Sequence, residues 1–299
     1  MKLVYHEGKN FGDALNSIIF NHYIPELLNP NSQITLLGIG SILGLKQNIK
    51  GKKVVFSSGY AAHQTDTYGK LPKLDKNWDI ICVRGPLTAK ALGIEHKLAV
   101  ADGAILIPKI LPLSNLGGND IGFMPHHKSM DMFSGWPQLC KELNISLIRP
   151  SLPPLEIINK LSKLKLLITE AMHGAIVADA YRIPWTPVKL YPFINEFKWN
   201  DWGQSVGLET LKFHNVTYQL HNQAFLNEVI KNKSQNLLPN ILTNQIAQKV
   251  FHSRIKQVRK ELASLIKNHQ PQLSPNGIIE LKQELLIERL QHLKRKYGA

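Results

Sequence analysis

Short apolar runs alternate with helix-like stretches along most of the chain, which predicts an α/β fold. The runs are continuous rather than alternating with polar residues, as expected for strands buried on both faces of a parallel sheet. We expect strands at 2–6, 34–41, 53–59, 79–85, 97–103, 119–127, 145–150, 166–174 and 184–190. We expect helices at 13–28, 86–93, 129–144, 154–164 and 174–182. Such strand–helix alternation is typical of layered α/β proteins.

A Pro-, Gly- and Asn-rich segment at 111–120 separates two sets of strands and is interpreted as a linker. A chain of 299 residues is long enough for two domains. We therefore predict an N-terminal Rossmann-like domain at 1–116, a second at 117–243, and basic C-terminal helices at 244–299 that pack on the domains. Residues 191–243 show only weak periodicity.

The chain carries 36 Lys and Arg against 22 Asp and Glu, a net charge of +14. Such a charge favours an anionic partner: nucleic acid, a phosphorylated small molecule or an acidic membrane surface. Residues 244–299 hold 11 Lys and Arg and 4 Glu, so half of the excess lies there. Packing on the domains is the favoured role of these helices, and peripheral membrane association through 244–299 is the alternative.

The sequence favours a cytoplasmic protein, with the inner face of the membrane as a further location. No window approaches 18 consecutive apolar residues, so no transmembrane helix is expected. Cys82 and Cys140 lie in apolar patterns without metal-ligand spacing, which favours buried, reduced thiols.

Polar residues follow several predicted strands, at the edge where open α/β sheets bind ligands. Neither a dinucleotide fingerprint nor a phosphate-binding P-loop is present. After the first strand, Asn10 and Asp13 flank a turn at Gly12, and Asp13 either caps the next helix or contacts a ligand. Gly40 and Ser41 let the backbone approach a ligand, or serve packing alone.

Arg84 ends another predicted strand, directly before Gly85 and Pro86. Pro86 is favourable at the first position of a helix, and Gly85 permits an unusual backbone conformation. Arg84 would then lie at a helix N-terminus and could bind a carboxylate or phosphate through two hydrogen bonds. A surface ion pair is the alternative.

The strand at 119–127 ends in His126 and His127, followed by Lys128. Adjacent side chains on an extended chain point to opposite faces, so the two imidazoles are not expected to share a metal. Anion binding is favoured, with a polar turn as the alternative. No Asp and His cluster has metal-ligand spacing, so no metal is expected.

The most specific pattern runs from Glu170 through His173 and Gly174. An apolar strand leads into a helix that opens with small residues, which leaves its N-terminus open to an anion. His173 could donate a hydrogen bond to that anion or transfer a proton. A structural role is the alternative for a single histidine.

The segment 197–204 contains Lys198, Trp199, Asp201 and Trp202 and is interpreted as a loop. Tryptophan faces stack on sugar rings, and the polar side chains between them can bind hydroxyl groups. The segment is thus a candidate platform for a saccharide, and packing on the core is the alternative.

Taken together, these motifs resemble the polysaccharide pyruvyltransferase family. The resembling stretches are NFGDALN (10–16), GIGSIL (38–43), VRGPLTAKALG (83–93), ADGAILIP (101–108), FMPHH (123–127) and EAMHGAIVADAYRIPW (170–185). The resemblance implies two Rossmann-like domains facing a cleft, as in GT-B glycosyltransferases. It also implies phosphoenolpyruvate as co-substrate without another cofactor, an oligosaccharide or lipid-linked saccharide as acceptor, and a 4,6-linked ketal as product.

By this resemblance, Arg84 and His173 correspond to the donor-site arginine and histidine of the family. Many relatives have Arg-Leu before that histidine, where this chain has Ala171 and Met172. The lost charge could come from Lys128, Lys189 or Lys198. The chemistry needs an acid near the methylene carbon of the donor and a base for the hydroxyls.

The candidate residues form three groups. The catalytic candidates are His173, Asp102, Glu170 and Asp13, and which carboxylate acts is open. The donor-binding candidates are Arg84, Gly40, Ser41, His126, His127, Lys128 and Gly174. The acceptor-binding candidates are Asn10, Trp199, Asp201, Trp202 and Lys198.

Two other functions are the alternatives. One is a sugar-nucleotide glycosyltransferase, which has the same architecture and a different donor. The other is a basic nucleic-acid-binding protein, for which no motif is found.

Overall fold

The computed structural model is an α/β protein with two parallel sheets, which confirms the predicted fold class. It describes residues 1–298 except 7, 9, 45–48, 63–68, 115 and 236. Every strand pair within the described residues is parallel, as expected for the continuous apolar runs. The assignment of the two halves to Rossmann-like domains of the GT-B type stays a prediction.

The first sheet is built around β4 (Lys52–Tyr60). One edge of β4 pairs with β2 (Ile34–Leu37) and, further along, with β3 (Gly40–Leu43), and the other edge pairs with β5 (Trp78–Val83). The short strand β1 (Lys2–Val4) pairs with β2. The helices of this half are α1 (Phe11–Tyr23), α2 (Pro86–Leu92) and α3 (Ile107–Ile110), with 3₁₀ turns η1 (Pro25–Leu27), η2 (His96–Leu98) and η3 (Gly103–Leu106).

The second sheet has the order β10, β9, β8, β6, β7. Its strands are β6 (Asp120–Met124), β7 (Ser146–Leu147), β8 (Leu164–Thr169), β9 (Trp185–Lys189) and β10 (His214–Asn215). The helices of this half are α4 (His127–Met132), α5 (Trp136–Glu142), α6 (Pro154–Leu161), α7 (Met172–Ala180), α8 (Glu196–Ser205) and α9 (Gln223–Lys233).

One continuous core joins the two halves. Leu15 and Ile19 on α1 belong to the same cluster of buried side chains as Ile176 and Val177 on α7. Helices α1 and α7 also contact each other directly. Because both helices follow strands of their own sheets, this packing brings the carboxyl ends of β1 and β8 to the same place.

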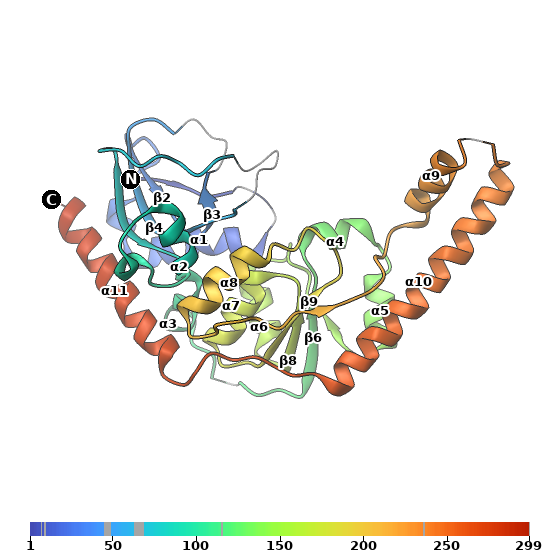
Figure 1. Cartoon of the computed structure of the whole chain (residues 1–299). Coiled ribbons are helices and arrows are strands. Elements are labelled where there is room, and N and C mark those ends of the chain that lie inside the picture. Colours follow the sequence, from blue (N-terminus) through green and yellow to red (C-terminus); the bar gives the residue numbers. More distant parts are fainter. Residues whose placement is uncertain are drawn as a thin grey trace.

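The two C-terminal helices pack on different halves (Figure 1). Helix α10 (Asn240–Asn268) packs Val258, Leu262 and Leu265 into the core of the second half. Helix α11 (Ile278–Tyr297) crosses to the first half, where Gln283 donates a 2.7 Å hydrogen bond to the carbonyl of Ile105. Among the described residues, no helix is long and apolar enough to cross a membrane.

Four sequence expectations about elements were wrong. Residues 97–103 form no strand, because the chain turns into η2 and η3 and keeps only one bridge, Val83 to Ala99. The run 34–41 is divided into β2 and β3, and the helix expected at 129–144 is broken into α4 and α5. The segment 197–204 is part of helix α8, not a loop. The expected linker at 111–120 lies between α3 and β6, although residue 115 is outside the described residues.

Candidate active site

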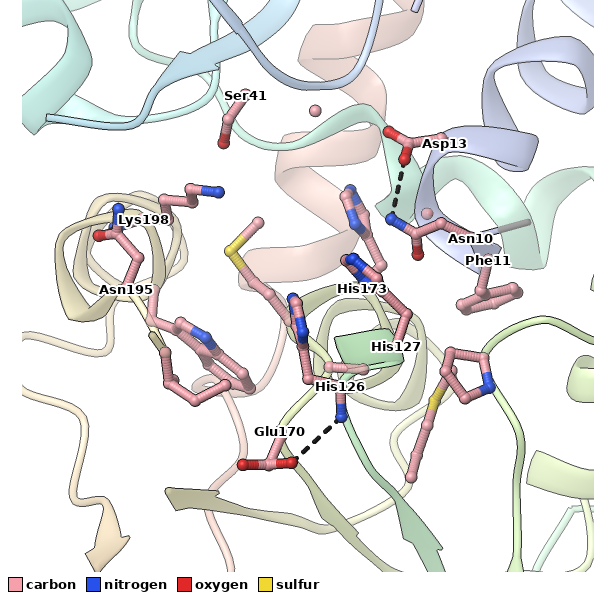
Figure 2. A pocket seen from close by; sticks show the side chains of 18 of the residues that line it. Asn10, Phe11, Asp13, Ser41, His126, His127, Glu170, His173, Asn195 and Lys198 are labelled. Carbon is pink, nitrogen blue, oxygen red and sulfur yellow. Dashed lines mark hydrogen bonds between the residues drawn. The ribbon is translucent and has the colours of Figure 1, made fainter. Parts of the chain in front are cut away.

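A pocket of roughly 850 Å³, partly open to solvent, lies where α1 and α7 begin. Figure 2 shows Asn10 and Asp13 on one side, Lys198 and Asn195 on the other, and histidines between them. Ten candidate residues line it: Asn10, Asp13, Gly40, Ser41, His126, His127, Glu170, His173, Lys198 and Trp199. Arg84, Asp102, Lys128, Gly174, Asp201 and Trp202 are not among its lining residues.

The pocket lies at two helix N-termini that come from different halves of the chain. Phe11, Gly12 and Asp13 open α1, and Met172 and His173 open α7. The first N–H groups of a helix have no acceptor within the helix, and the helix dipole adds partial positive charge there. The N–H of Phe11 already donates to the carbonyl of Pro150 at 2.8 Å, so an anion in the pocket would use the other first-turn N–H groups of α1 and those of α7.

Helix α1 approaches His173 so closely that only glycine fits at position 12. A Cβ atom on Gly12 would lie 1.9 Å from Nδ1 of His173. Glycine is therefore required at position 12 because any side chain there would overlap the imidazole of His173. The helix itself begins at Phe11, earlier than the expected start at residue 13.

His173 faces the buried carboxylate of Asp102, with 3.6 Å between Nε2 and Oδ2. Burial opposes the ionisation of Asp102, but His173, the backbone N–H of Ala104 and Arg84 outweigh it, so the pKa of Asp102 lies below its usual value. The carboxylate is thus charged at neutral pH. Asp102 can orient the imidazole and stabilise its protonated form.

His126 and His127 lie side by side, with ring centroids 4.1 Å apart, and both line the pocket. The expectation that they point to opposite faces was wrong, because β6 ends at Met124 and His127 already begins α4. Burial, followed by the neighbouring cations, lowers the pKa of His126 to about 3, so this ring is neutral. Its Nδ1 accepts the N–H of Lys128 at 3.3 Å, which assigns the ring proton to Nε2.

Glu170 is almost completely buried at the end of β8. Burial raises the pKa of its carboxyl group to about 7. One oxygen accepts the N–H of His126 at 3.2 Å, and the other accepts the N–H of Leu190 at 3.0 Å. Glu170 therefore fixes the loop that carries the two histidines and holds a proton over part of the neutral range.

Helix α8 brings Lys198 into the pocket. Asn195 caps this helix by accepting the N–H of Lys198, and its Nδ2 donates to the carbonyl of Ala61 in the first half at 2.6 Å. Burial and the positive charge of Arg84 lower the pKa of Lys198 to about 8, although Asp13 opposes them. The ammonium is thus charged at neutral pH.

Of the three lysines considered for the missing arginine charge, only Lys198 lines the pocket. Lys189 is paired with Glu196 at 2.5 Å, and the ammonium of Lys128 lies over the ring of Phe193 at 5.9 Å from its centroid. Of these three lysines, Lys198 is therefore the one in the lining of the pocket.

Asp13 lies opposite Lys198, across the pocket (Figure 2). Its Oδ2 accepts a hydrogen bond from Nδ2 of Asn10 at 2.8 Å. Burial raises the pKa of Asp13, and the positive charge of His173 acts against that shift. Gly40 approaches the same carboxylate and has a φ of 108°, a conformation that requires glycine. Asp13 thus contributes a carboxyl group with a raised pKa to the lining of the pocket.

Arg84 lies behind the pocket, fully buried, rather than on its wall or at the surface. Its Nε donates to Asp201 Oδ2, its Nη1 to Ser41 Oγ and its Nη2 to the carbonyl of Tyr60, each at 2.9 Å. Gly85 has an extended backbone with φ of −163°, so its role is space: a Cβ there would lie 1.9 Å from the carbonyl oxygen of Asp201. The structure gives Arg84 contact with the pocket through Ser41.

The segment 197–204 was expected to present two tryptophans to a saccharide, but only Lys198 and Trp199 of this segment line the pocket. Trp202 and Asp201 are fully buried, and Asp201 accepts the N–H and the hydroxyl of Thr88 at 2.8 and 2.6 Å. Trp199 is also largely buried but still lines the pocket. Gly174 packs against Met124, where a Cβ would lie 2.6 Å from the sulfur atom. Trp202 therefore serves packing, the alternative left open for this segment, and Asp201 serves the buried ion pair with Arg84.

Asn195 and His6 line the pocket and were not among the sequence candidates. For Asn195 a signal was present, because Asn followed by Glu196 is a common helix start. Among the described residues, no group of three or more His, Cys, Asp or Glu is arranged to hold a metal ion.

The fold and the site define an α/β protein whose anion-ready pocket lies at the ends of two parallel sheets. The sequence profile of the Polysaccharide pyruvyl transferase family matches residues 10–189, and the chain belongs to this family. The chain is 36% identical over 214 residues to the succinoglycan biosynthesis protein ExoV of Rhizobium meliloti (strain 1021). That match covers 70% of this chain and 66% of the relative, just under two thirds of its length. Comparison with solved structures finds no match.

Proposed function

We propose that the protein transfers the pyruvyl group of phosphoenolpyruvate to two hydroxyl groups of a hexose, and thereby forms a ketal and releases phosphate. The family membership supports pyruvyl transfer. The relative named for succinoglycan biosynthesis supports an exopolysaccharide precursor as acceptor. The 4,6 linkage of the ketal is part of the proposal and rests on the family resemblance of the motifs.

The observation that carries this proposal is the convergence of α1, α7 and Lys198 on one pocket. Phosphoenolpyruvate carries a phosphate and a carboxylate, and both need N–H donors or cations. Two helix N-termini and an ammonium offer separate positions for the two groups. Neutral His126 adds an Nε2–H donor that does not depend on pH near neutrality.

The reaction requires acid–base chemistry and involves no oxidation or reduction. An acid gives a proton to the methylene carbon, and the first hydroxyl attacks the adjacent carbon as it loses its own proton to a base. The bond between that carbon and the phosphate oxygen then breaks, and phosphate leaves. The second hydroxyl attacks the same carbon and loses its proton, which completes the ketal.

Asp13 is the carboxyl group we assign to proton exchange with the substrate. Its raised pKa favours a proton-bearing form, and it lies in the pocket wall near His173. His173 binds the phosphate of the donor or transfers a proton, and Asp102 orients its imidazole and supports the positive form. Glu170 is engaged by two backbone N–H groups, so we assign it to holding the histidine loop.

A donor panel tests the proposal against the glycosyltransferase alternative. Purified protein is incubated with a saccharide precursor of the exopolysaccharide and either phosphoenolpyruvate or a set of sugar nucleotides. Phosphate release with one pyruvyl ketal gained per acceptor supports the proposal. Sugar transfer from a nucleotide, without pyruvyl transfer from phosphoenolpyruvate, overturns it.

A further inference from the structure

Helices α9 and α10 form an arm that extends away from the second sheet, with α9 beside the far end of α10 (Figure 1). Only the part of α10 near the sheet is anchored in the core, through Val258, Leu262 and Leu265. Further out, α10 buries Thr243 and Ala247, and α9 buries Leu226. Neither the pocket nor the proposed reaction uses this arm.

The face of α10 opposite its buried residues carries a lysine stripe. Lys249, Lys256, Lys260 and Lys267 are all exposed, and they are separated by seven, four and seven residues. Because seven and four residues are close to whole turns, the four side chains lie along one line of the helix. Within the described chain none of the four forms an ion pair, whereas Arg259 pairs with Glu142.

The outer end of the arm is apolar. Leu237 is 82% exposed and Ile241 is 74% exposed, the two highest values among the large apolar side chains of the described chain. Leu242 is also exposed, at 41%. Leu242 is seven residues before Lys249, so it lies at the head of the lysine stripe. These three side chains (Leu237, Ile241 and Leu242) form an apolar tip where α9 ends and α10 begins, and all three are exposed.

We propose that the arm docks on an anionic lipid membrane, with the apolar tip inserted among the acyl chains and the lysine stripe against the headgroups. An amphipathic helix with a basic face and an exposed apolar patch binds such surfaces by burying apolar area and attracting anionic lipids. The sequence offered membrane association of all of residues 244–299 as an alternative to packing. Helix α11 packs on the first half, so the proposal is limited to the arm.

Charge and chemistry favour a lipid surface over other occupants. A second copy of the chain would bring another basic surface against the stripe, since α9 and α10 hold eight Lys and Arg against Glu228 and Glu261. A nucleic acid would satisfy the lysines but leave Leu237 and Ile241 in water. A membrane satisfies both parts of the arm.

Vesicle co-sedimentation tests the proposal with the full chain. Vesicles of phosphatidylglycerol and phosphatidylcholine in equal parts should bind the protein, and vesicles of phosphatidylcholine alone should bind it at least tenfold more weakly. The double variant Leu237→Asp/Ile241→Asp should reduce binding at least tenfold. Leu155→Asp, at a site 56% exposed on α6, is the matched control and should bind as the wild type does.

A second pair of variants tests whether binding depends on the lysine stripe itself or only on the net charge of the protein. Lys249→Gln/Lys256→Gln/Lys260→Gln should weaken binding at least tenfold. Lys76→Gln/Lys90→Gln/Lys165→Gln removes the same charge from exposed sites elsewhere and should have little effect. Equal weakening by both triple variants overturns the proposal.

The proposal is also overturned if the wild type does not bind anionic vesicles, or if the aspartate variant binds them normally. It is overturned as well if sedimentation shows a lipid-free dimer that the aspartate variant dissociates, or if duplex DNA binds the stripe regardless of the tip. Pyruvyl transfer to a water-soluble acceptor should be equal in the wild type and the tip variant, so the docking test and the functional test fail independently.

Discussion

Arg84 and Asp201 form a fully buried ion pair, with 2.9 Å between Nε and Oδ2, that joins the end of β5 to helix α8. Asp201 is three residues after Lys198 on the same helix, so the pair fixes the helix that carries the pocket lysine. Its second oxygen accepts the N–H of Thr88 in the first turn of α2. The pair therefore links the two halves of the chain behind the pocket.

Removing one partner of this pair should destabilise the protein strongly. Asp201→Ala leaves the Arg84 guanidinium buried and partly unpaired, and should lower the free energy of unfolding by about 3–5 kcal/mol. Urea unfolding followed by circular dichroism measures the change. The exposed pair of Arg259 and Glu142 is the control, and Glu142→Ala should lower the free energy of unfolding far less. Equal losses in the two variants would contradict the buried-pair interpretation.

Gly12→Ala should reduce activity by displacing the imidazole of His173. The added methyl group would lie 1.9 Å from Nδ1, so the ring must move. We expect a fall in kcat of at least tenfold and a loss of stability of about 1–3 kcal/mol from overpacking. The double variant Gly12→Ala/His173→Ala should regain the stability and stay inactive. If the single variant keeps wild-type kcat, the close packing does not position His173.

Lys198 should determine the affinity for phosphoenolpyruvate. Lys198→Ala removes a charge-assisted contact and should raise KM for the donor about tenfold to a hundredfold. Because the pKa of Lys198 is about 8, the wild-type KM should rise as pH increases through 8 and the ammonium is lost. Lys198→Arg keeps its charge and should not show that rise. Lys189→Gln is the control, and a donor KM raised equally there would contradict the assignment.

The sequence predicted the α/β class and most elements, because long apolar runs and helix starts such as Pro86 are local signals. It failed at 97–103, where an apolar pattern forms 3₁₀ turns instead of a strand. The apolar pattern cannot distinguish a strand from 3₁₀ turns when the segment is buried by helices that are distant in the sequence. Helix α8 was missed because Trp199 and Trp202 suggested a ligand platform.

The candidate site shows a similar limit. Strand-end position identified His126, His127, Glu170 and His173 at the edge of one sheet and Asp13 at the edge of the other, but that the two edges meet depends on the packing of α1 on α7. The partner of Arg84 was not predictable, because Asp201 is 117 residues away along the chain. The local sequence indicates at which strand or helix end a residue lies. Its contacts with distant residues depend on how the two halves pack.

Glu170 and His126 should give opposite pH dependences of stability. Folded Glu170 keeps its proton up to a pKa of about 7, whereas the unfolded chain releases it near 4.5. Wild-type stability relative to Glu170→Gln should therefore fall by at most about 3 kcal/mol as pH rises through this window.

Folded His126 stays neutral down to about pH 3, whereas the unfolded chain takes up a proton below 6.5. Stability relative to His126→Gln should therefore be lost as pH falls below 6.5. Urea unfolding of the three proteins from pH 5 to pH 8 checks both signs. Parallel curves for the wild type and either variant would show that the corresponding group is not held as the structure indicates.

The proposed function requires that this pocket protonates phosphoenolpyruvate and transfers its pyruvyl group. The most direct measurement is the reaction in D₂O, with mass spectrometry of the acceptor and assay of phosphate. We expect one deuterium in the methyl group of each ketal, one phosphate per ketal, and loss of both products in His173→Ala at unchanged vesicle binding. Ketal formation by His173→Ala at the wild-type rate, or a ketal without deuterium, would contradict it.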